Sequence, residues 1–245
     1  MSPSDARLAA DLAERAGQLL LSLERDSGQT GKELGKLGDA QSNELLLAQL
    51  AQARPGDAVL SEESVDSPER LSADRVWIID PLDGTREYGM PGRPDWAVHV
   101  ALWERGAGIT AAAVAQPAFD AVYASDDAHA RASESMVFLV SDSRPPAFAA
   151  PVAAELGGEV RPMGSAGAKA MAVLRGDAGA YLHAGGQWEW DSAAPVGVVQ
   201  AAGLHATRVD GSPLVYNSEH PYLPDLLICR RELADTLLAA IAAES

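Results

Sequence analysis

The sequence predicts an α/β protein in which a pair of helices comes first, a strand-rich middle follows, and helices alternate with strands in the C-terminal half. Three observations support this order: leucines at helical spacing near the N-terminus, short apolar runs separated by Gly, Pro and Asp in the middle, and a change of pattern after a polar segment at 125–135. A chain of 245 residues can bury a core without disulfides and has room for one large domain or two modest ones.

Two helices are expected at the N-terminus. The leucines between Leu8 and Leu23 recur at helical spacing, and Ser4 is placed to cap the first turn. The polar stretch 26–38 is punctuated by glycine, and we predict a loop there. A second helix is expected from about Asp39 to Arg54, where a Pro-Gly-Asp turn ends it.

Strands dominate the middle of the chain. Each expected strand is a short apolar run between turn residues, at 58–60, 76–79, 97–103, 109–115 and 121–124. The polar segment 125–135 is the candidate boundary, which divides the chain into residues 1–130 and 131–245. Beyond it we expect strands at 136–140, 178–182 and 226–229, and helices at 151–156, 166–174, 190–202 and 232–240.

Composition limits the partners. Acidic residues outnumber basic ones 35 to 19, for a formal charge of -16, and such a field repels nucleic-acid polymers and anionic membranes. The single cysteine, Cys229, excludes a disulfide framework or cysteine-rich metal site and suits a reducing compartment as a buried strand thiol. No signal-like segment opens the sequence, and the longest apolar patch, at 19–21, is far too short for a membrane span. We therefore expect a cytoplasmic protein.

The most informative segment is Trp-Ile-Ile-Asp-Pro-Leu-Asp-Gly-Thr at 77–85. A buried apolar strand delivers Asp80 and Asp83 to a turn, where hard carboxylate oxygens suit Mg²⁺. Gly84 and Thr85 then open a helix, whose first N–H groups can bind phosphate. An Asp-Gly pair alone indicates only a turn, but an apolar strand that ends in paired acids is costly without a cation.

Two further acidic segments need tertiary context. Glu62 and Glu63 follow an apolar strand end, where adjacent glutamates usually form a solvated loop. Asp191 lies between tryptophans at a predicted helix start, and taken singly it is most simply an N-cap.

Glu-Glu-Ser at 62–64, the 77–85 motif and Trp-Asp-Ser-Ala-Ala at 190–194, in this order and spacing, resemble the inositol monophosphatase superfamily of Mg²⁺-dependent, Li⁺-sensitive phosphatases. Gly164-Ser165 with Lys169, and Tyr216-Asn217, also fit, so the resemblance covers essentially the whole chain. Arg-Glu-Tyr at 86–88 resembles the nucleotidase branch, and segments 164–171 and 181–191 resemble its actinobacterial 3′-phosphoadenosine 5′-phosphate phosphatases.

The resemblance implies an alternating α-β-α-β-α sandwich with the active site between its two halves. By motif position it implies two Mg²⁺ ions, with a third left open, and Glu63 as a secondary candidate ligand. The implied metal ligands are Glu62, Asp80, the Leu82 carbonyl, Asp83 and Asp191.

The resemblance also implies the catalytic and substrate groups. Asp39 would pair with the Thr85 hydroxyl to orient the attacking water, and Glu62 joins them as a catalytic residue. The superfamily usually carries a Thr two residues before the first acid, where this chain has Leu37, so Glu33 and Glu44 compete with Asp39. The implied substrate contacts are Gly84, Thr85, Ser165, Lys169 and Asp191.

Lys169 and two histidines, His99 and His183, lie outside the acidic motifs. Lys169 would reach the second phosphate of a bisphosphate, or else lie on a helix surface. His99 is expected to be a core histidine, with a catalytic role as the alternative. His183 is a candidate for contact with a ribose or a base.

The function expected from the resemblance is that of a 3′(2′),5′-bisphosphate nucleotidase, which releases the 3′-phosphate of 3′-phosphoadenosine 5′-phosphate and clears a by-product of sulfate assimilation. Alternatives are an inositol-1-phosphatase, a fructose-1,6-bisphosphatase, or a non-enzymatic metal-binding regulatory module. A haloacid-dehalogenase mechanism needs acids two residues apart, and here they are three apart. The expected partner is a small phosphate ester, and a homodimer is left open because no apolar stripe establishes one.

Overall fold

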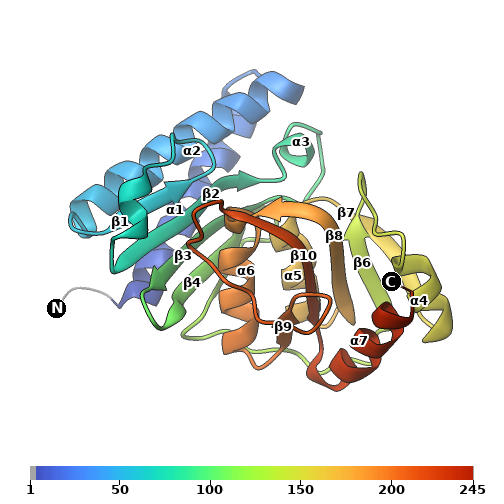
Figure 1. Cartoon of the computed structure of the whole chain (residues 1–245). Coiled ribbons are helices and arrows are strands. Elements are labelled where there is room, and N and C mark those ends of the chain that lie inside the picture. The colour runs from blue at the N-terminus through green and yellow to red at the C-terminus, as the bar shows by residue number, and fades with distance from the viewer. Residues whose placement is uncertain (1–3, 245) are drawn as a thin grey trace.

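The computed structural model describes residues 4–244, in which two five-stranded sheets alternate with three layers of helices (Figure 1). The first sheet has the order β1-β2-β3-β4-β5, with β1 parallel to β2 and the other neighbours antiparallel. Its strands are β1 (Ala58–Ser61), β2 (Arg75–Asp83), β3 (Ala97–Glu104), β4 (Gly108–Gln116) and β5 (Ala121–Ala124). All of them precede the polar segment 125–135.

The second sheet has the order β7-β6-β8-β10-β9. Strand β6 is parallel to β7 and β8, and β10 is antiparallel to β8 and β9. Its strands are β6 (Val137–Ser141), β7 (Glu159–Met163), β8 (Ala180–Trp188), β9 (His205–Thr207) and β10 (Tyr222–Cys229).

The helices form the remaining layers. On the outer face of the first sheet lie α1 (Asp5–Asp26) and α2 (Gly31–Ala53). Between the sheets lie α5 (Ala166–Leu174) and α6 (Glu189–Ala201), and against the far face of the second sheet lie α4 (Ala149–Glu155) and α7 (Ala234–Ala243). A single turn, α3 (Thr85–Tyr88), follows β2, and 3-10 turns occupy Pro68–Leu71, Pro117–Phe119 and Arg231–Leu233. The predicted α-β-α-β-α sandwich is confirmed.

Strand β2 shows why the sandwich buries both faces of the first sheet. Trp77 and Ile79 pack in the core with α1 and α2, whereas Val76 and Ile78 pack in the central core with α5 and α6. Successive side chains of a strand point to opposite faces, so a strand covered on both sides needs an uninterrupted apolar run. The run that leads to Asp80 is therefore a consequence of its place between two helical layers.

The prediction of a loop over 26–38 is wrong for its second part, because α2 begins at Gly31. A Cβ at Gly35 would lie 2.7 Å from Thr85 Cγ2, and one at Gly38 would lie 2.9 Å from the Tyr88 ring. These glycines let α2 approach α3 closely, and they do not interrupt the helix. The prediction of the Ser4 cap is confirmed, since its side chain accepts from the Arg7 N–H.

Two strands escaped prediction. The edge strand β7 carries the largely exposed sequence Glu-Val-Arg-Pro-Met, and β9 has three residues, so neither shows an apolar run. Strand β8 continues to Trp188, six residues beyond the predicted end, through Gly185 and Gly186, both at positive φ. Cys229 is a buried thiol in β10, as expected. None of the described helices combines the length and hydropathy that a transmembrane segment requires.

Candidate active site

The two acids of the 77–85 motif lie at the end of β2, where the ladder with β3 is irregular. Asp80 pairs with His99 and Asp83 with Ala97, so the register shifts between the two pairs. Residues three apart on a regular strand point to opposite faces, whereas a bulge can turn both to one side. The carbonyl of Pro81, inside the bulge, accepts from the buried Ser42 hydroxyl on α2 at 2.7 Å.

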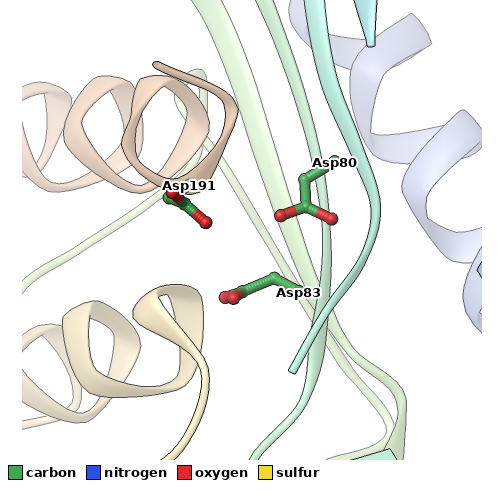
Figure 2. Close-up of side chains that lie close together, drawn as sticks. All are labelled: Asp80, Asp83 and Asp191. Atoms are coloured by element: carbon green, nitrogen blue, oxygen red, sulfur yellow. The ribbon is translucent and has the colours of Figure 1, made fainter. Parts of the chain in front are cut away.

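Asp191 approaches this pair from the helix layer between the two sheets. It comes from the first turn of α6, and Figure 2 shows its carboxylate pointing toward those of Asp80 and Asp83. Ligand oxygens of the three residues lie within 4.8 Å of one another. The simple N-cap interpretation of Asp191 is wrong, because it is the third residue of α6 and accepts from the Trp188 N–H at 2.6 Å.

The three carboxylates suit a divalent cation. Asp80 is 1% exposed, and while its Oδ1 accepts from the Leu82 N–H at 3.0 Å, its Oδ2 is buried without a hydrogen-bond partner. An unpartnered buried carboxylate oxygen costs free energy, and a cation among such oxygens removes that cost. An all-oxygen set of this kind is typical of Mg²⁺ and Ca²⁺ sites.

Without a cation, crowding shifts the pKa values of these acids in opposite directions. Burial, with the charges of Glu62 and Asp83, raises the pKa of Asp80 well above its usual range. Burial and the charge of Asp83 raise the pKa of Asp191 to about 6. Burial would also raise the pKa of Asp83, but His99 and hydrogen bonds from Ser165 and Gly167 outweigh it and lower that pKa to about 2.

Asp39 and Thr85 form a second part of the site. The Thr85 hydroxyl lies 3.1 Å from both Asp39 Oδ1 and the Leu82 carbonyl oxygen, and its single proton can be donated to one of them at a time. Burial, followed by the charge of Glu63, raises the pKa of Asp39 to about 7. The competing acids Glu33 and Glu44 are exposed, and no hydrogen bond joins either to Thr85 in the described chain.

Glu62 and Glu63 follow β1 at the edge of this cluster, and both residues are exposed. Ser61 holds the turn, because its hydroxyl donates to Asn43 Oδ1 on α2 at 2.8 Å and accepts from the Glu63 N–H at 3.4 Å. Burial of the carboxyl group by its surroundings, and the charge of Asp191, raise the pKa of Glu62 to about 8. The charge of Asp191 therefore acts on Glu62, but Glu62 is not among the three acids whose oxygens lie within 4.8 Å of one another.

Ser165 and Lys169 hold the segment that faces Asp83. The Ser165 hydroxyl donates to Asp83 Oδ2 at 2.5 Å and accepts from the Ala168 N–H as the N-cap of α5. Lys169 is 4% exposed, so the alternative that places it on a helix surface is wrong. Its ammonium group donates to the carbonyls of Gly164, Ser165 and Met163 and lies 4.8 Å from the centre of the Tyr181 ring.

His99 is fully buried, as expected, and it also touches the acidic cluster. Its Nδ1 lies 3.1 Å from the Trp190 carbonyl oxygen on α6, and its Nε2 lies 3.2 Å from Asp83 Oδ2 on β2. The ring therefore braces the two elements that carry Asp83 and Asp191. His183 lines the adjoining cleft, and its Nε2 lies 2.9 Å from the Gly186 carbonyl oxygen.

A cleft of about 340 Å³ opens beside the cluster, within the size range of small-molecule sites. Its lining includes the predicted residues Asp83, Gly84, Thr85, Ser165, Lys169 and Asp191. The lining also includes the loop after β6, which no pattern in the sequence marked; its Asp142 pairs with Arg86 of α3. Arg86 also pairs with Glu87. Of these three residues, only Arg86 and Glu87 belong to a segment that carries the resemblance, the Arg-Glu-Tyr at 86–88.

The sequence profile of the inositol monophosphatase family matches residues 4–245. The chain belongs to this family. A 3′-phosphoadenosine 5′-phosphate phosphatase of Mycobacterium leprae is 54% identical over 97% of this chain and 93% of its own length. A protein of the same name from Mycobacterium tuberculosis is 56% identical over 93% of this chain and 89% of its own length.

The fold agrees with solved structures of the inositol monophosphatase family. CysQ of Bacteroides thetaiotaomicron superposes with a TM-score of 0.78 at 24% identity, over 93% of this chain and 97% of that one. At this identity the superposition shows the fold alone. Family membership and the names of the relatives together make the chain a phosphatase of the inositol monophosphatase family.

Proposed function

We propose that this phosphatase hydrolyses the 3′-phosphate of 3′-phosphoadenosine 5′-phosphate to give AMP and phosphate, and so clears a by-product of sulfate assimilation. The observation that carries the proposal is the meeting of Asp80, Asp83 and Asp191 within 4.8 Å beside the Asp39–Thr85 pair. The relatives named as 3′-phosphoadenosine 5′-phosphate phosphatases support the choice of substrate.

In this proposal the Asp80, Asp83 and Asp191 carboxylates hold Mg²⁺, with the Leu82 carbonyl and Glu62 completing the set. When bound, the ions supply positive charge for the phosphate and make a water molecule more acidic. The unpartnered Oδ2 of Asp80 supports this assignment, because a buried lone oxygen needs a positive partner. Two ions are proposed, and Glu62 is preferred over Glu63 because the charges of Asp191 and Asp83 act on its carboxyl group.

The Thr85 hydroxyl orients the water. With its own proton donated to Asp39 Oδ1, the Thr85 oxygen can accept a hydrogen bond from water and turn a lone pair of that water toward phosphorus. The Gly84 and Thr85 N–H groups, at the turn where Gly84 adopts a φ of 88°, receive the phosphate oxygens. No covalent nucleophile from the chain is needed.

The test is phosphate release from three substrates in Mg²⁺: 3′-phosphoadenosine 5′-phosphate, inositol-1-phosphate and fructose-1,6-bisphosphate. We expect the highest kcat/KM for the nucleotide and a loss of turnover in EDTA. A preference of more than about a hundredfold for inositol phosphate would defeat the nucleotide assignment and favour the inositol phosphatase alternative. Mg²⁺ binding without phosphate release from any ester would favour a regulatory module.

A further inference from the structure

The cationic side chains that line the cleft differ in how they are already used. Of the described residues in its lining, Arg86, Arg144 and Lys169 carry positive charge. Arg86 is paired with Glu87 and Asp142, and the Lys169 ammonium donates to backbone carbonyls. An ammonium has three hydrogens, so Lys169 has none left for a ligand unless one of these bonds breaks.

Arg144 is different. In the part of the chain that the structure describes, no hydrogen bond or ion pair engages its guanidinium group, and the residue is exposed at the cleft. A guanidinium offers five N–H donors in a planar fork that matches a phosphate group. The unpaired guanidinium group at the wall of this cleft is available to bind an anion.

The backbone holds Arg144 in place. Its N–H donates to the Ser141 hydroxyl at 3.2 Å, and Pro145 and Pro146 follow it directly. A residue that precedes proline is restricted to extended conformations, so the loop presents the side chain on a stiff backbone. A ligand then has to order the Arg144 side chain but little of its backbone.

The loop is also tied to the opposite half of the molecule. Asp142 accepts from Arg86 of α3, and its other oxygen lies 3.5 Å from Arg93 Nη2. Arg93 in turn pairs with Asp95, whose Oδ2 accepts from the Gly164 N–H at 2.7 Å. These contacts fix the position of the Arg144 loop relative to the turn at Gly84.

The charge of Arg144 acts on His183, which also lines the cleft. Burial is the main cause of the lowered pKa of His183, and the charges of Lys169 and Arg144 add to it. The other charged side chains of the lining are all acidic: Asp83, Glu87, Asp142 and Asp191. Two of them, Glu87 and Asp142, pair with Arg86. Among the described residues that line the cleft, Arg144 is therefore the cation free to bind an anionic group that lies away from Asp80, Asp83 and Asp191.

We propose that Arg144 binds the second phosphate group of a bisphosphorylated nucleoside and thereby selects it over a monophosphate. The inference rests on the proposed function and names the residue that distinguishes its substrate class. Lys169 acts instead as a buried brace that holds the carbonyls of the 163–165 segment in place.

The test compares 3′-phosphoadenosine 5′-phosphate with adenosine 3′-monophosphate, which lacks only the second phosphate. In Arg144→Ala we expect kcat/KM for the bisphosphate to fall about tenfold or more, as for loss of a hydrogen bond to a charged group. We expect less than a threefold change for the monophosphate, and a partial loss in Arg144→Lys. The matched control is Arg25→Ala, an exposed arginine at the end of α1 that pairs with Asp26.

Product inhibition gives a second readout. Because AMP keeps the 5′-phosphate, Arg144→Ala should weaken inhibition by AMP about tenfold but leave inhibition by inorganic phosphate unchanged. If Arg144→Ala lowers kcat/KM equally for both nucleotides, or for neither, Arg144 does not bind the second phosphate. The proposed function would still stand if the wild-type enzyme hydrolyses the bisphosphate. A wild-type enzyme that prefers inositol-1-phosphate over both nucleotides, or hydrolyses neither, would overturn the proposed function and this inference together.

Discussion

The Thr85 hydroxyl and Asp39 Oδ1 lie 3.1 Å apart, although Asp39 belongs to the middle of α2 and Thr85 opens α3. The close approach of the two elements depends on Gly35, where a Cβ would lie 2.7 Å from the Thr85 methyl group. The pair is thus positioned by helix packing and not by the local sequence around either residue.

This pair gives the first prediction. Thr85→Ala removes the hydroxyl that orients water, so kcat should fall by about a hundredfold or more while KM changes by less than about threefold. Thr85→Ser keeps the hydroxyl and should retain most of the rate. Steady-state kinetics with saturating Mg²⁺ test both variants, and a Thr85→Ala enzyme with near-normal kcat would remove Thr85 from the mechanism.

The orphaned oxygen of Asp80 gives a prediction about stability that is separate from activity. Asp80→Asn removes a buried carboxyl group that is costly to ionise, so in EDTA the melting temperature should stay equal or rise. The variant should also lose the increase in melting temperature that Mg²⁺ gives the wild type. Thermal unfolding with and without Mg²⁺ measures both effects. A variant that still gains stability from Mg²⁺ like the wild type would argue against Asp80 as a ligand.

The raised pKa values predict how stability depends on pH without metal. The folded-state pKa values of Asp191, Asp39 and Glu62 are about 6, 7 and 8, above their ordinary values. A raised acid pKa means that the folded state holds protons more tightly, so the free energy of unfolding falls as pH rises through these values. We expect denaturant unfolding in EDTA to show lower stability at pH 8.5 than at pH 6.

Mg²⁺ should reverse this slope, because it binds the ionised carboxylates and displaces their protons. Calorimetric titration at pH 7 in buffers of different ionisation enthalpy should therefore reveal proton release on Mg²⁺ binding. Asp39→Asn, which removes one of the raised groups, should flatten the slope seen in EDTA. A wild-type stability in EDTA that does not change, or that rises, between pH 6 and 8.5 would contradict raised pKa values for these acids.

The brace formed by His99 predicts a sensitive position on the neighbouring helix. A Cβ at Gly167 would lie 2.1 Å from His99 Nε2, so Gly167→Ala must displace the ring or the start of α5. We expect a loss of about 1–3 kcal/mol in the free energy of unfolding and a large loss of activity. Gly56→Ala is the matched control, since nothing lies within 4 Å of its added Cβ. Equal stability of the two variants, measured by urea unfolding, would contradict the brace.

Asp80 and Asp83 could be predicted because their signal is local: an apolar run followed by the two acids is visible within a short window of sequence. The metal role of Asp191 came only from the resemblance, because an acid at a helix start, taken singly, indicates an N-cap. The sandwich followed from the resemblance, and the order of segments agreed with it. Helix α2 was predicted too short because a glycine that permits close helix packing, such as Gly35 or Gly38, looks the same in the sequence as a glycine that forms a loop.

Contacts between distant segments could not be predicted in this way. Lys169 has the sequence surroundings of an exposed helical residue, and only the approach of Tyr181 and the 163–165 carbonyls buries it. The links from Asp142 to Arg86 and from His99 to Trp190 join residues from different layers. Which arginine of the cleft is left without a partner depends on such pairings, so no pattern in the sequence singles out Arg144.

The cluster draws Asp80 and Asp83 from the first sheet and Asp191 from the helix layer that joins it to the second. It therefore requires α6 to be packed against the first sheet, and a fragment that lacks α6 loses it. A fragment that ended at 130 would retain the 77–85 motif in full, yet it would have neither the third carboxylate nor the opposite wall of the cleft. The affinity for Mg²⁺ therefore measures whether α6 is packed against the first sheet, and it would fall if the two separated.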